Sequence, residues 1–145
     1  IHKLAGSYRY MLKTEDEQLV SLREELDFAQ RYYDLLKVRF PEGLTIETSI
    51  PEEYMSRSVL PCALQLLIEN ATKHNTVSSA RPLVIRITAH DGCVRVCNEI
   101  IPKVSKSPST GLGLKYMKQQ YLDLSGKDVD IQQTEETFCV TIPLL

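Results

Sequence analysis

The stretch P-C-A-L-Q-L-L-I-E-N-A-T-K-H-N, residues 61–75, changes character halfway along its length. It is apolar up to Ile68 and strongly polar from Glu69 onward. Because proline is tolerated at the first position of a helix, the stretch predicts a helix that begins near Pro61 and ends at about His74. A change of this kind within one helix often marks a functional site.

Four polar side chains meet at the end of this predicted helix. Residues four apart share a helix face, so Asn70 lies beside His74 and Glu69 beside Lys73. The amide oxygen of Asn70 suits Mg²⁺, an ion that keeps most of its waters and bridges phosphates, which Lys73 and His74 could contact. The alternative is an ordinary polar helix end, where Lys73 and His74 are favourable at the negative end of the dipole. Taken alone, this alternative is the better supported.

A second motif, S-T-G-L-G-L-K-Y at residues 109–116, leads from a loop into a predicted helix that ends at about Leu124. Gly111 and Gly113 let the backbone approach a ligand closely, and the unpaired amides of a helix N-terminus favour phosphate. Lys115 adds a positive charge. The motif lacks the third glycine of a dinucleotide fingerprint and the G-K-[ST] of a P-loop, so by itself it is better explained as helix capping.

A long helix is predicted before these motifs, with a shorter one over residues 3–13. The capping box Thr14-Glu15-Asp16-Glu17 predicts its start, and its end is expected at about Val38. An apolar heptad seam follows it: Leu19, Leu22, Leu26, Ala29, Tyr33, Leu36 and Phe40. The seam favours pairing with another helix or dimerisation, or else it covers the domain's own sheet, and the two are not exclusive.

The remaining pattern predicts strands joined by turns. Asp91-Gly92 is a strong hairpin signal, and residues 99–110, rich in Pro, Ser and Lys, read as a mobile loop. The expected strands are residues 44–48, 83–89, 94–98, 129–133 and 138–142. Together these elements predict one mixed sheet covered by helices.

Composition limits the function classes. The chain has 145 residues, and its net charge of -2, from 17 basic and 19 acidic residues, gives no basic field for nucleic acid. No apolar run reaches the roughly 20 residues that span a bilayer. The chain opens at Ile1 without an initiator Met, so we expect a piece of a longer protein whose membrane part lies upstream. The cysteines lie in apolar segments and are interpreted as reduced thiols: Cys62, Cys93, Cys97 and Cys139.

The order of the motifs is more specific than either motif. E-N-A-T-K-H-N on a helix, two strands ending in Asn98, a loop, G-L-G-L opening a helix and a closing hairpin resemble the GHKL ATP-binding fold. More narrowly, the chain resembles the LytS-type sensor histidine kinases of bacterial two-component systems. Further segments carry this resemblance: Pro61-x-x-Leu64-Gln65, Tyr8-Arg9-Tyr10, Glu24-Glu25-Leu26, Tyr32-Tyr33 and Arg39-Phe40-Pro41.

The resemblance implies an α+β fold, a two-layer α/β sandwich of the GHKL (Bergerat) type. Residues 1–40 would form a helical linker and dimerisation segment, and residues 41–145 the ATP-binding catalytic domain. ATP and Mg²⁺ are the implied cofactors. A homodimer through the N-terminal helices and a downstream response regulator are the implied partners, without nucleic acid. We expect a cytoplasmic domain of an inner-membrane-anchored protein, in contact with the membrane only through upstream segments.

The resemblance also implies residue roles. Asn70 would coordinate the Mg²⁺ of ATP, and Glu69 would order the metal's water shell or assist proton movement. The loop 105–110 would close over the nucleotide as a lid, with adenine against the sheet. Glu69 and Lys73 are the catalytic candidates, and the ATP-binding candidates are Asn70, Lys73, His74, Asn98, Gly111, Gly113 and Leu114.

This sequence departs from the family pattern at two places. Asn98 stands where an aspartate should read the adenine amino group, and Glu99-Ile100-Ile101 replaces the glycine that should follow. An amide oxygen still accepts a hydrogen bond, but without the strengthening charge, so weaker adenine binding is expected. The family's phosphoacceptor histidine lies upstream: His2 lacks its surroundings, and His90 is interpreted as an exposed strand-end residue. This segment alone is therefore not expected to autophosphorylate.

Three functions follow from these observations. The leading one is a histidine kinase catalytic region that transfers the γ-phosphoryl group of ATP to an upstream histidine. The second is a degenerate GHKL module that dimerises and relays signals without competent ATP binding, and Asn98 supports it. The third, another GHKL enzyme such as an ATP-driven clamp or a serine kinase, is disfavoured by the long helix that bears Arg39-Phe40.

Overall fold

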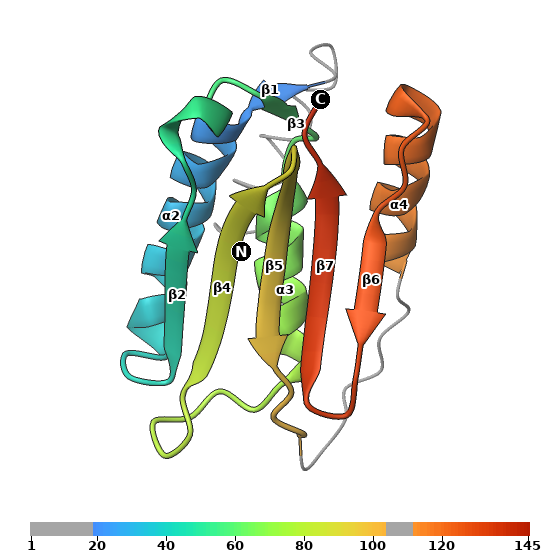
Figure 1. Cartoon of the computed structure of the whole chain (residues 1–145). Coiled ribbons are helices and arrows are strands. Elements are labelled where there is room, and N and C mark those ends of the chain that lie inside the picture. Colours follow the sequence, from blue (N-terminus) through green and yellow to red (C-terminus); the bar gives the residue numbers. More distant parts are fainter. Residues whose placement is uncertain (1–18, 104–111) are drawn as a thin grey trace.

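The computed structural model describes residues 19–103 and 112–145. Its main sheet has the strand order β2-β4-β5-β7-β6, and α2, α3 and α4 all lie against one face of it (Figure 1). The sheet strands are Leu44–Ser49 (β2), Leu83–His90 (β4), Cys93–Glu99 (β5), Asp130–Gln133 (β6) and Thr137–Pro143 (β7). The helices are Leu22–Arg39 (α2), Ala63–His74 (α3) and Leu112–Ser125 (α4).

The sheet is mixed, as predicted. β2 and β4 are parallel, whereas β4, β5, β7 and β6 pair antiparallel in succession. Val20–Ser21 (β1) and Ser58–Val59 (β3) form a separate two-stranded sheet, and Glu52–Tyr54 is a short 3-10 helix. The predicted α+β fold with helices covering a mixed sheet is confirmed. Neither two-residue strand was predicted, because so short a strand has no periodicity.

The core lies between the sheet and the helices. Side chains alternate along β4, so that Ile85 and Ile87 are buried while Arg86 and His90 are exposed. The helices and the central strands contribute matching apolar side chains, among them Leu36, Leu64, Ile68, Val94, Val96, Met117, Tyr121, Val140 and Ile142. Within the described ranges, every helix is too short or too polar to cross a membrane.

The predicted start of the long helix is wrong. Val20–Ser21 form β1, so a helix cannot run unbroken from Thr14. The helix begins instead at Leu22 with Ser21 as N-cap, whose hydroxyl accepts a hydrogen bond from the Glu24 amide at 3.1 Å. Ser21-x-x-Glu24 has the same S/T-x-x-E form as the stretch beginning at Thr14, which is why local pattern could not choose between them. Residues 3–17 lie outside the described residues.

The heptad seam of α2 packs inside this domain. Leu22, Ala29 and Leu36 are buried in the core, and Leu26, Tyr33 and Phe40 pack against it. The seam therefore covers the domain's own core, which was one of the two predicted roles. The boundary predicted between residues 40 and 41 stays a prediction, although α2 shares its core with α3.

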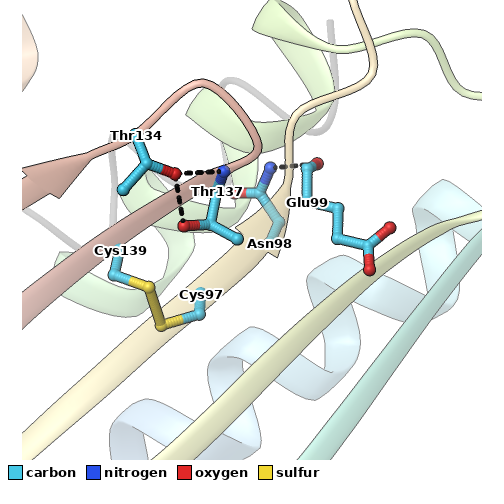
Figure 2. Close-up of a disulfide and its surroundings, with 6 residues drawn as sticks. All are labelled: Cys97, Asn98, Glu99, Thr134, Thr137 and Cys139. Carbon is cyan, nitrogen blue, oxygen red and sulfur yellow. Dashed lines mark hydrogen bonds between the residues drawn. A yellow bond between two sulfur atoms is a disulfide. The ribbon is translucent and has the colours of Figure 1, made fainter.

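The interpretation of all four cysteines as reduced thiols is wrong for one pair. Cys97 of β5 and Cys139 of β7 are register partners whose Cα atoms lie 4.2 Å apart, and their sulfurs form a disulfide (Figure 2). Two cysteines directly opposite each other on antiparallel strands come this close only through strand register, which sequence spacing does not reveal. Cys62 and Cys93 are not part of a disulfide.

The predicted turn at Asp91-Gly92 and the predicted closing hairpin are both present. Asp91 and Gly92 both have positive φ, 52° and 74°, as a two-residue hairpin turn between β4 and β5 requires. The β6–β7 hairpin closes on Thr134, whose hydroxyl oxygen accepts the amide of Thr137 at 2.9 Å and contacts the Thr137 hydroxyl (Figure 2).

The start of α3 is held by side chains of α2 and α4. Glu25 of α2 is fully buried, and its carboxylate accepts hydrogen bonds from the amides of Cys62 and Leu64, each at 2.9 Å. Tyr121 of α4, also fully buried, accepts the amide of Leu60 through its hydroxyl oxygen at 3.2 Å. The backbone before and at the first turn of α3 is thus bonded to side chains far away in the sequence.

Candidate functional site

A cavity of about 670 Å³ lies between α3, α4 and the helix-facing side of β6 and β7. Its volume falls in the range of roughly 300–1,000 Å³ that small-molecule sites occupy. The lining residues are Leu66, Glu69, Asn70, Ala71, Lys73, His74, Asn75, Ile100, Leu112, Gly113, Leu114, Lys115, Lys118, Ile131, Gln133 and Phe138. The two motifs singled out in the sequence therefore face the same space.

The polar half of α3 forms one wall of the cavity. Glu69, Asn70, Lys73 and His74 all line it, because helical spacing brings residues three and four apart onto one side. Glu69 and Asn70 are half-buried, whereas Lys73 and His74 are exposed. The wall therefore offers oxygen ligands deeper in the helix and cationic groups near its end.

Asn75 ties this wall to the segment that follows β5. It is buried, its amide nitrogen donates to the Ala71 carbonyl at 2.9 Å, and its amide oxygen accepts from the Ile101 backbone at 2.8 Å. The next residue adds a second contact to the same segment, because the Thr76 amide donates a hydrogen bond to the Ile101 carbonyl at 2.9 Å. The C-terminal end of α3 is therefore fixed although its side chains face solvent.

The pKa of His74 lies below its ordinary value. Partial desolvation of this still exposed side chain favours the neutral imidazole, and the nearby positive charges of Lys73 and Lys103 add to the effect. A neutral imidazole can still donate one hydrogen bond, and an anion placed beside it would raise its pKa again. The site thus has an electrostatic preference for a negatively charged ligand.

The first turn of α4 forms the opposite wall. Gly113 lies so close to α3 that a β-carbon at this position would come within 3.0 Å of the Leu66 side chain. A side chain at residue 113 would therefore require the Leu66 side chain to move by a few tenths of an ångström. This close approach brings Leu114 and Lys115 to the cavity across from Glu69 and Asn70.

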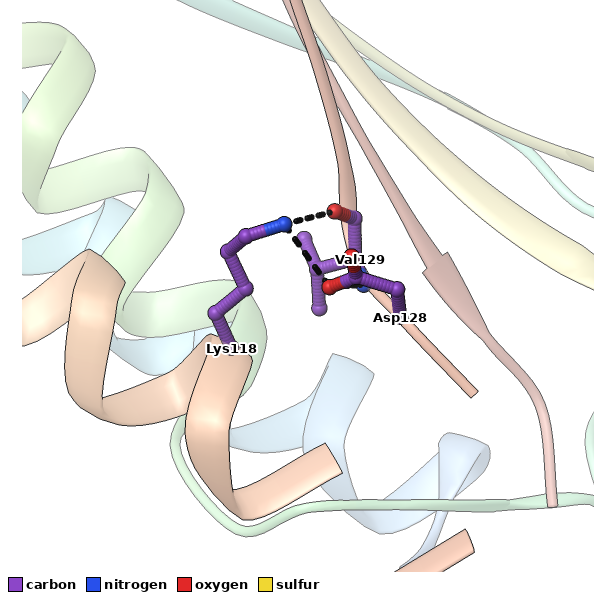
Figure 3. Close-up of polar contacts among 3 residues, drawn as sticks. All are labelled: Lys118, Asp128 and Val129. Carbon is purple, nitrogen blue, oxygen red and sulfur yellow. Dashed lines mark hydrogen bonds and ion pairs between the residues drawn. The ribbon is translucent and has the colours of Figure 1, made fainter. Parts of the chain in front are cut away.

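One helical turn further on, Lys118 is held in place. Its ammonium group donates to the Asp128 carboxylate at 2.7 Å and to the Val129 carbonyl at 3.0 Å (Figure 3). The hydrogen bond from Lys118 is the main reason why the pKa of Asp128 is lowered. Lys118 thereby lines the cavity in a fixed orientation, and with Lys73 and Lys115 it makes the lining rich in positive charge.

The floor of the cavity is apolar. Ile131 of β6 and Phe138 of β7 point toward the helices, and Ile100 follows β5. Gln133, the register partner of Phe138, is the polar group among them. An apolar surface beside a cationic wall suits a ligand with a flat aromatic part and an anionic part.

Asn98, the predicted adenine reader, does not line the cavity. It is buried on the helix-facing side of β5, and its amide nitrogen donates to the neighbouring Glu99 carbonyl at 2.8 Å (Figure 2). The structure therefore gives Asn98 a local backbone contact. Its predicted part in nucleotide binding stays a prediction.

The structure brings most of the predicted site residues together. Six of them line the cavity: Glu69, Asn70, Lys73, His74, Gly113 and Leu114. Gly111 and the predicted lid over residues 105–110 lie outside the described residues. Sequence reasoning missed Asn75, Lys118, Ile131, Gln133 and Phe138. Two of these residues had a signal: Asn75 ends the E-N-A-T-K-H-N motif, and Lys118 is spaced three residues from Lys115 on a predicted helix.

The residues present fit a magnesium–nucleotide complex. Nowhere in the described ranges do three or more His, Cys, Asp or Glu side chains come together as a metal site. A metal here would therefore draw on Asn70, on waters ordered by Glu69 and on oxygens of its ligand, which is how Mg²⁺ is commonly bound with phosphates.

Comparison with known proteins agrees with the resemblance. A family model described as histidine kinase matches residues 1–44. The sensor protein LytS of Oceanobacillus iheyensis is 27% identical over 92% of this chain, which spans 26% of that protein. The sensor protein kinase HptS of Staphylococcus aureus is 31% identical over 61% of this chain, equal to 17% of that protein. The chain thus spans about a quarter or less of these relatives.

Solved structures share the fold. The Acinetobacter baumannii histidine kinase AdeS superimposes with a TM-score of 0.55 at 16% identity, over 97% of this chain and 77% of that one. The catalytic domain of histidine kinase ThkA does so with a TM-score of 0.54 at 17% identity, over 86% of this chain and 94% of that one. In sequence the chain is similar to LytS-type sensor histidine kinases, and its sheet and helices form the fold of histidine kinase catalytic domains.

Proposed function

We propose that the cavity binds ATP with Mg²⁺ and that this domain presents the γ-phosphoryl group to a phosphoacceptor histidine upstream of this segment in the intact protein. The observation that carries the proposal is the meeting of the polar end of α3 and the first turns of α4 around one cavity. The cavity has cationic walls, an amide ligand for the metal and an apolar floor.

Each group of cavity residues is assigned the part of the ligand that matches its chemistry. The apolar floor of Ile131 and Phe138 takes the base, while Lys73, Lys115 and Lys118 take the phosphates. Bound Mg²⁺ would supply charge neutralisation on the phosphoryl oxygens. Asn70 orients the metal and Glu69 its water shell, so that this domain acts by positioning and charge stabilisation rather than by forming a covalent bond.

The test is a calorimetric titration with ATP, with and without Mg²⁺. We expect magnesium-dependent binding that Asn70→Ala abolishes while the variant keeps the unfolding midpoint of the parent. Thr72→Ala on the same helix is the matched control, because Thr72 is absent from the cavity lining. Binding that persists unchanged in Asn70→Ala would contradict the assignment of the metal ligand.

A degenerate module is the second candidate, because the Asn98 amide is already bonded to the Glu99 carbonyl. On this reading the domain keeps the fold and relays signals without competent ATP binding. No heat from the parent at millimolar ATP would favour it. Binding gained in Asn98→Asp would then attribute the defect to this position.

The proposal extends to partners by family likeness. A homodimer through the N-terminal helices fits the exposed apolar side chains of Leu35 and Val38 on α2, which are 54% and 83% exposed. A response regulator would receive the phosphoryl group, and segments upstream would anchor the intact protein to the inner membrane. Sedimentation of a chain extended upstream, beside the same chain with Leu35→Lys and Val38→Glu, tests the dimer.

A further inference from the structure

The start of α3 rests on a charged group that belongs to another helix. Glu25 of α2 is fully buried, and beyond the Cys62 and Leu64 amides it also accepts the Gln65 amide at 3.4 Å. Carboxylates are favourable at a helix N-terminus, where unpaired amides carry partial positive charge. Here the carboxylate comes from a residue 37 to 40 positions away, so the cap also joins two elements.

The backbone at this junction takes a conformation that needs support. Cys62, the N-cap of α3, has a φ of 64°, in the left-handed region that a residue with a β-carbon rarely adopts. Its own side chain makes no capping hydrogen bond, and its amide donates to Glu25 instead. Burial and the negative charge of Glu25 raise the pKa of the Cys62 thiol to about 12, so the thiol adds no charge.

The other end of the same helix carries the candidate site. α3 has 12 residues, a length of roughly 18 Å at the rise of an α-helix. A short helix is rigid, so a translation or rotation of its first turn also displaces its last turn. Glu69, Asn70 and Lys73 lie on the last two turns and line the cavity.

We propose that Glu25 is a positioning residue for the nucleotide site. By holding the amides of Cys62, Leu64 and Gln65, it fixes the depth and rotation of α3 and so the places of Asn70 and Lys73 in the cavity. Because the carboxylate is carried by α2, a shift of α2 moves the site, which gives the N-terminal segment a mechanical connection to it. The consequence for ATP rests on the proposed function.

The test compares Glu25→Gln with Asp27→Asn, a matched carboxyl-to-amide change at an exposed position on the same helix. In Glu25→Gln an amide NH2 group replaces one carboxylate oxygen, so that a hydrogen-bond donor faces a backbone N–H that the oxygen had accepted. All measurements are made at a temperature where unfolding curves show each variant to be folded. If Glu25→Gln does not fold, Glu25→Asp replaces it, since it keeps the charge but withdraws the carboxylate by one methylene.

Two readouts are expected to change together. In Glu25→Gln the Mg-ATP affinity falls by about tenfold or more, because a small displacement of ligand-binding side chains strongly weakens their contacts. In Asp27→Asn the affinity stays within about twofold of the parent value. Amide NMR signals of Glu69, Asn70 and Lys73 shift in Glu25→Gln without any nucleotide. Shifts confined to residues 60–66 with unchanged affinity would overturn the proposal, leaving Glu25 as a local cap.

The NMR measurement distinguishes a failure of the proposed ATP-binding function from a failure of the positioning role of Glu25. If the parent does not bind Mg-ATP, the proposed function fails, while the shifts at Glu69, Asn70 and Lys73 still decide whether Glu25 positions that end of α3. If the parent binds and only the shifts are missing, the positioning role fails and the nucleotide site stands.

Discussion

The two ends of α3 belong to different environments. Leu64, at the start, is fully buried, and the amides around it are satisfied by side chains of α2 and α4. Lys73, at the end, is exposed and faces the cavity. One helix of 12 residues thus passes from the interior of the domain to its candidate site.

The difference explains how an open site stays ordered. Groups that bind a charged ligand must remain accessible, and accessible side chains contribute little to stability. The fixed end of α3 supplies that stability for the whole helix. If the two ends differ in this way, substitutions at the buried start of α3 change the stability of the fold, and substitutions at its exposed end change ligand binding.

The largest effect is expected at the buried end. Leu64→Ala removes a fully buried side chain and leaves a cavity, and we expect the free energy of unfolding to fall by about 3 kcal/mol. Urea unfolding followed by circular dichroism measures it. A loss in the free energy of unfolding below about 1 kcal/mol would contradict the proposed difference between the two ends of α3. A substitution at an exposed position typically changes stability by about 0.5 kcal/mol or less.

The reverse result is expected at the open end. Lys73→Ala should weaken ATP binding by about tenfold, the loss of one charge-assisted hydrogen bond, and change the free energy of unfolding by less than about 0.5 kcal/mol. Calorimetry and urea unfolding on the same preparation measure both. Arg31→Ala, an exposed cation of α2 that does not line the cavity, is the control and should leave both unchanged.

A smaller effect on stability is expected for Tyr121→Phe. The change keeps the buried ring but removes the oxygen that accepts the Leu60 amide, so a buried donor loses its partner. The free energy of unfolding should fall by about 1–2 kcal/mol. Tyr116→Phe is the control, since Tyr116 is 61% exposed on the same helix. Equal losses in both variants would indicate that the Leu60 contact contributes nothing.

The smallest effect is a pH dependence at His74. Its pKa is lowered in the folded chain, so the unfolded chain binds more protons once the pH falls below the ordinary value of 6.5. Stability should therefore decline as the pH falls below 6.5, and His74→Gln should flatten this decline. NMR titration of the imidazole should also show its pKa rising when ATP is added. An unchanged pKa with bound ATP would place the phosphates elsewhere.

Much of the fold could be predicted because it follows local patterns. The strand over residues 83–89 and the turn at Asp91-Gly92 were predicted, and both appear in the structure. Failures occurred where local pattern was ambiguous or silent. Thr14 and Ser21 head equally good capping boxes, and only pairing of β1 with β3 decides that the helix begins after Ser21.

The candidate site was predicted in part for the same reason. Glu69, Asn70, Lys73 and His74 share one helix, so their proximity follows from helical spacing. The floor residues Ile131 and Phe138 come from strands at the end of the chain and resemble any other core positions. Nothing in their own neighbourhood in the sequence indicates that they face a cavity.

The sequence by itself determined the main helices and strands and the motif order, and through them the resemblance to LytS-type sensor kinases. Helical and strand periodicity are local properties, and the motifs are contiguous. Only the tertiary structure decided that Glu25 caps α3, that Cys97 meets Cys139 and that Asn98 bonds to Glu99 away from the cavity. Contacts between distant residues depend on strand register and helix packing, which arise only when the whole chain buries its apolar faces together.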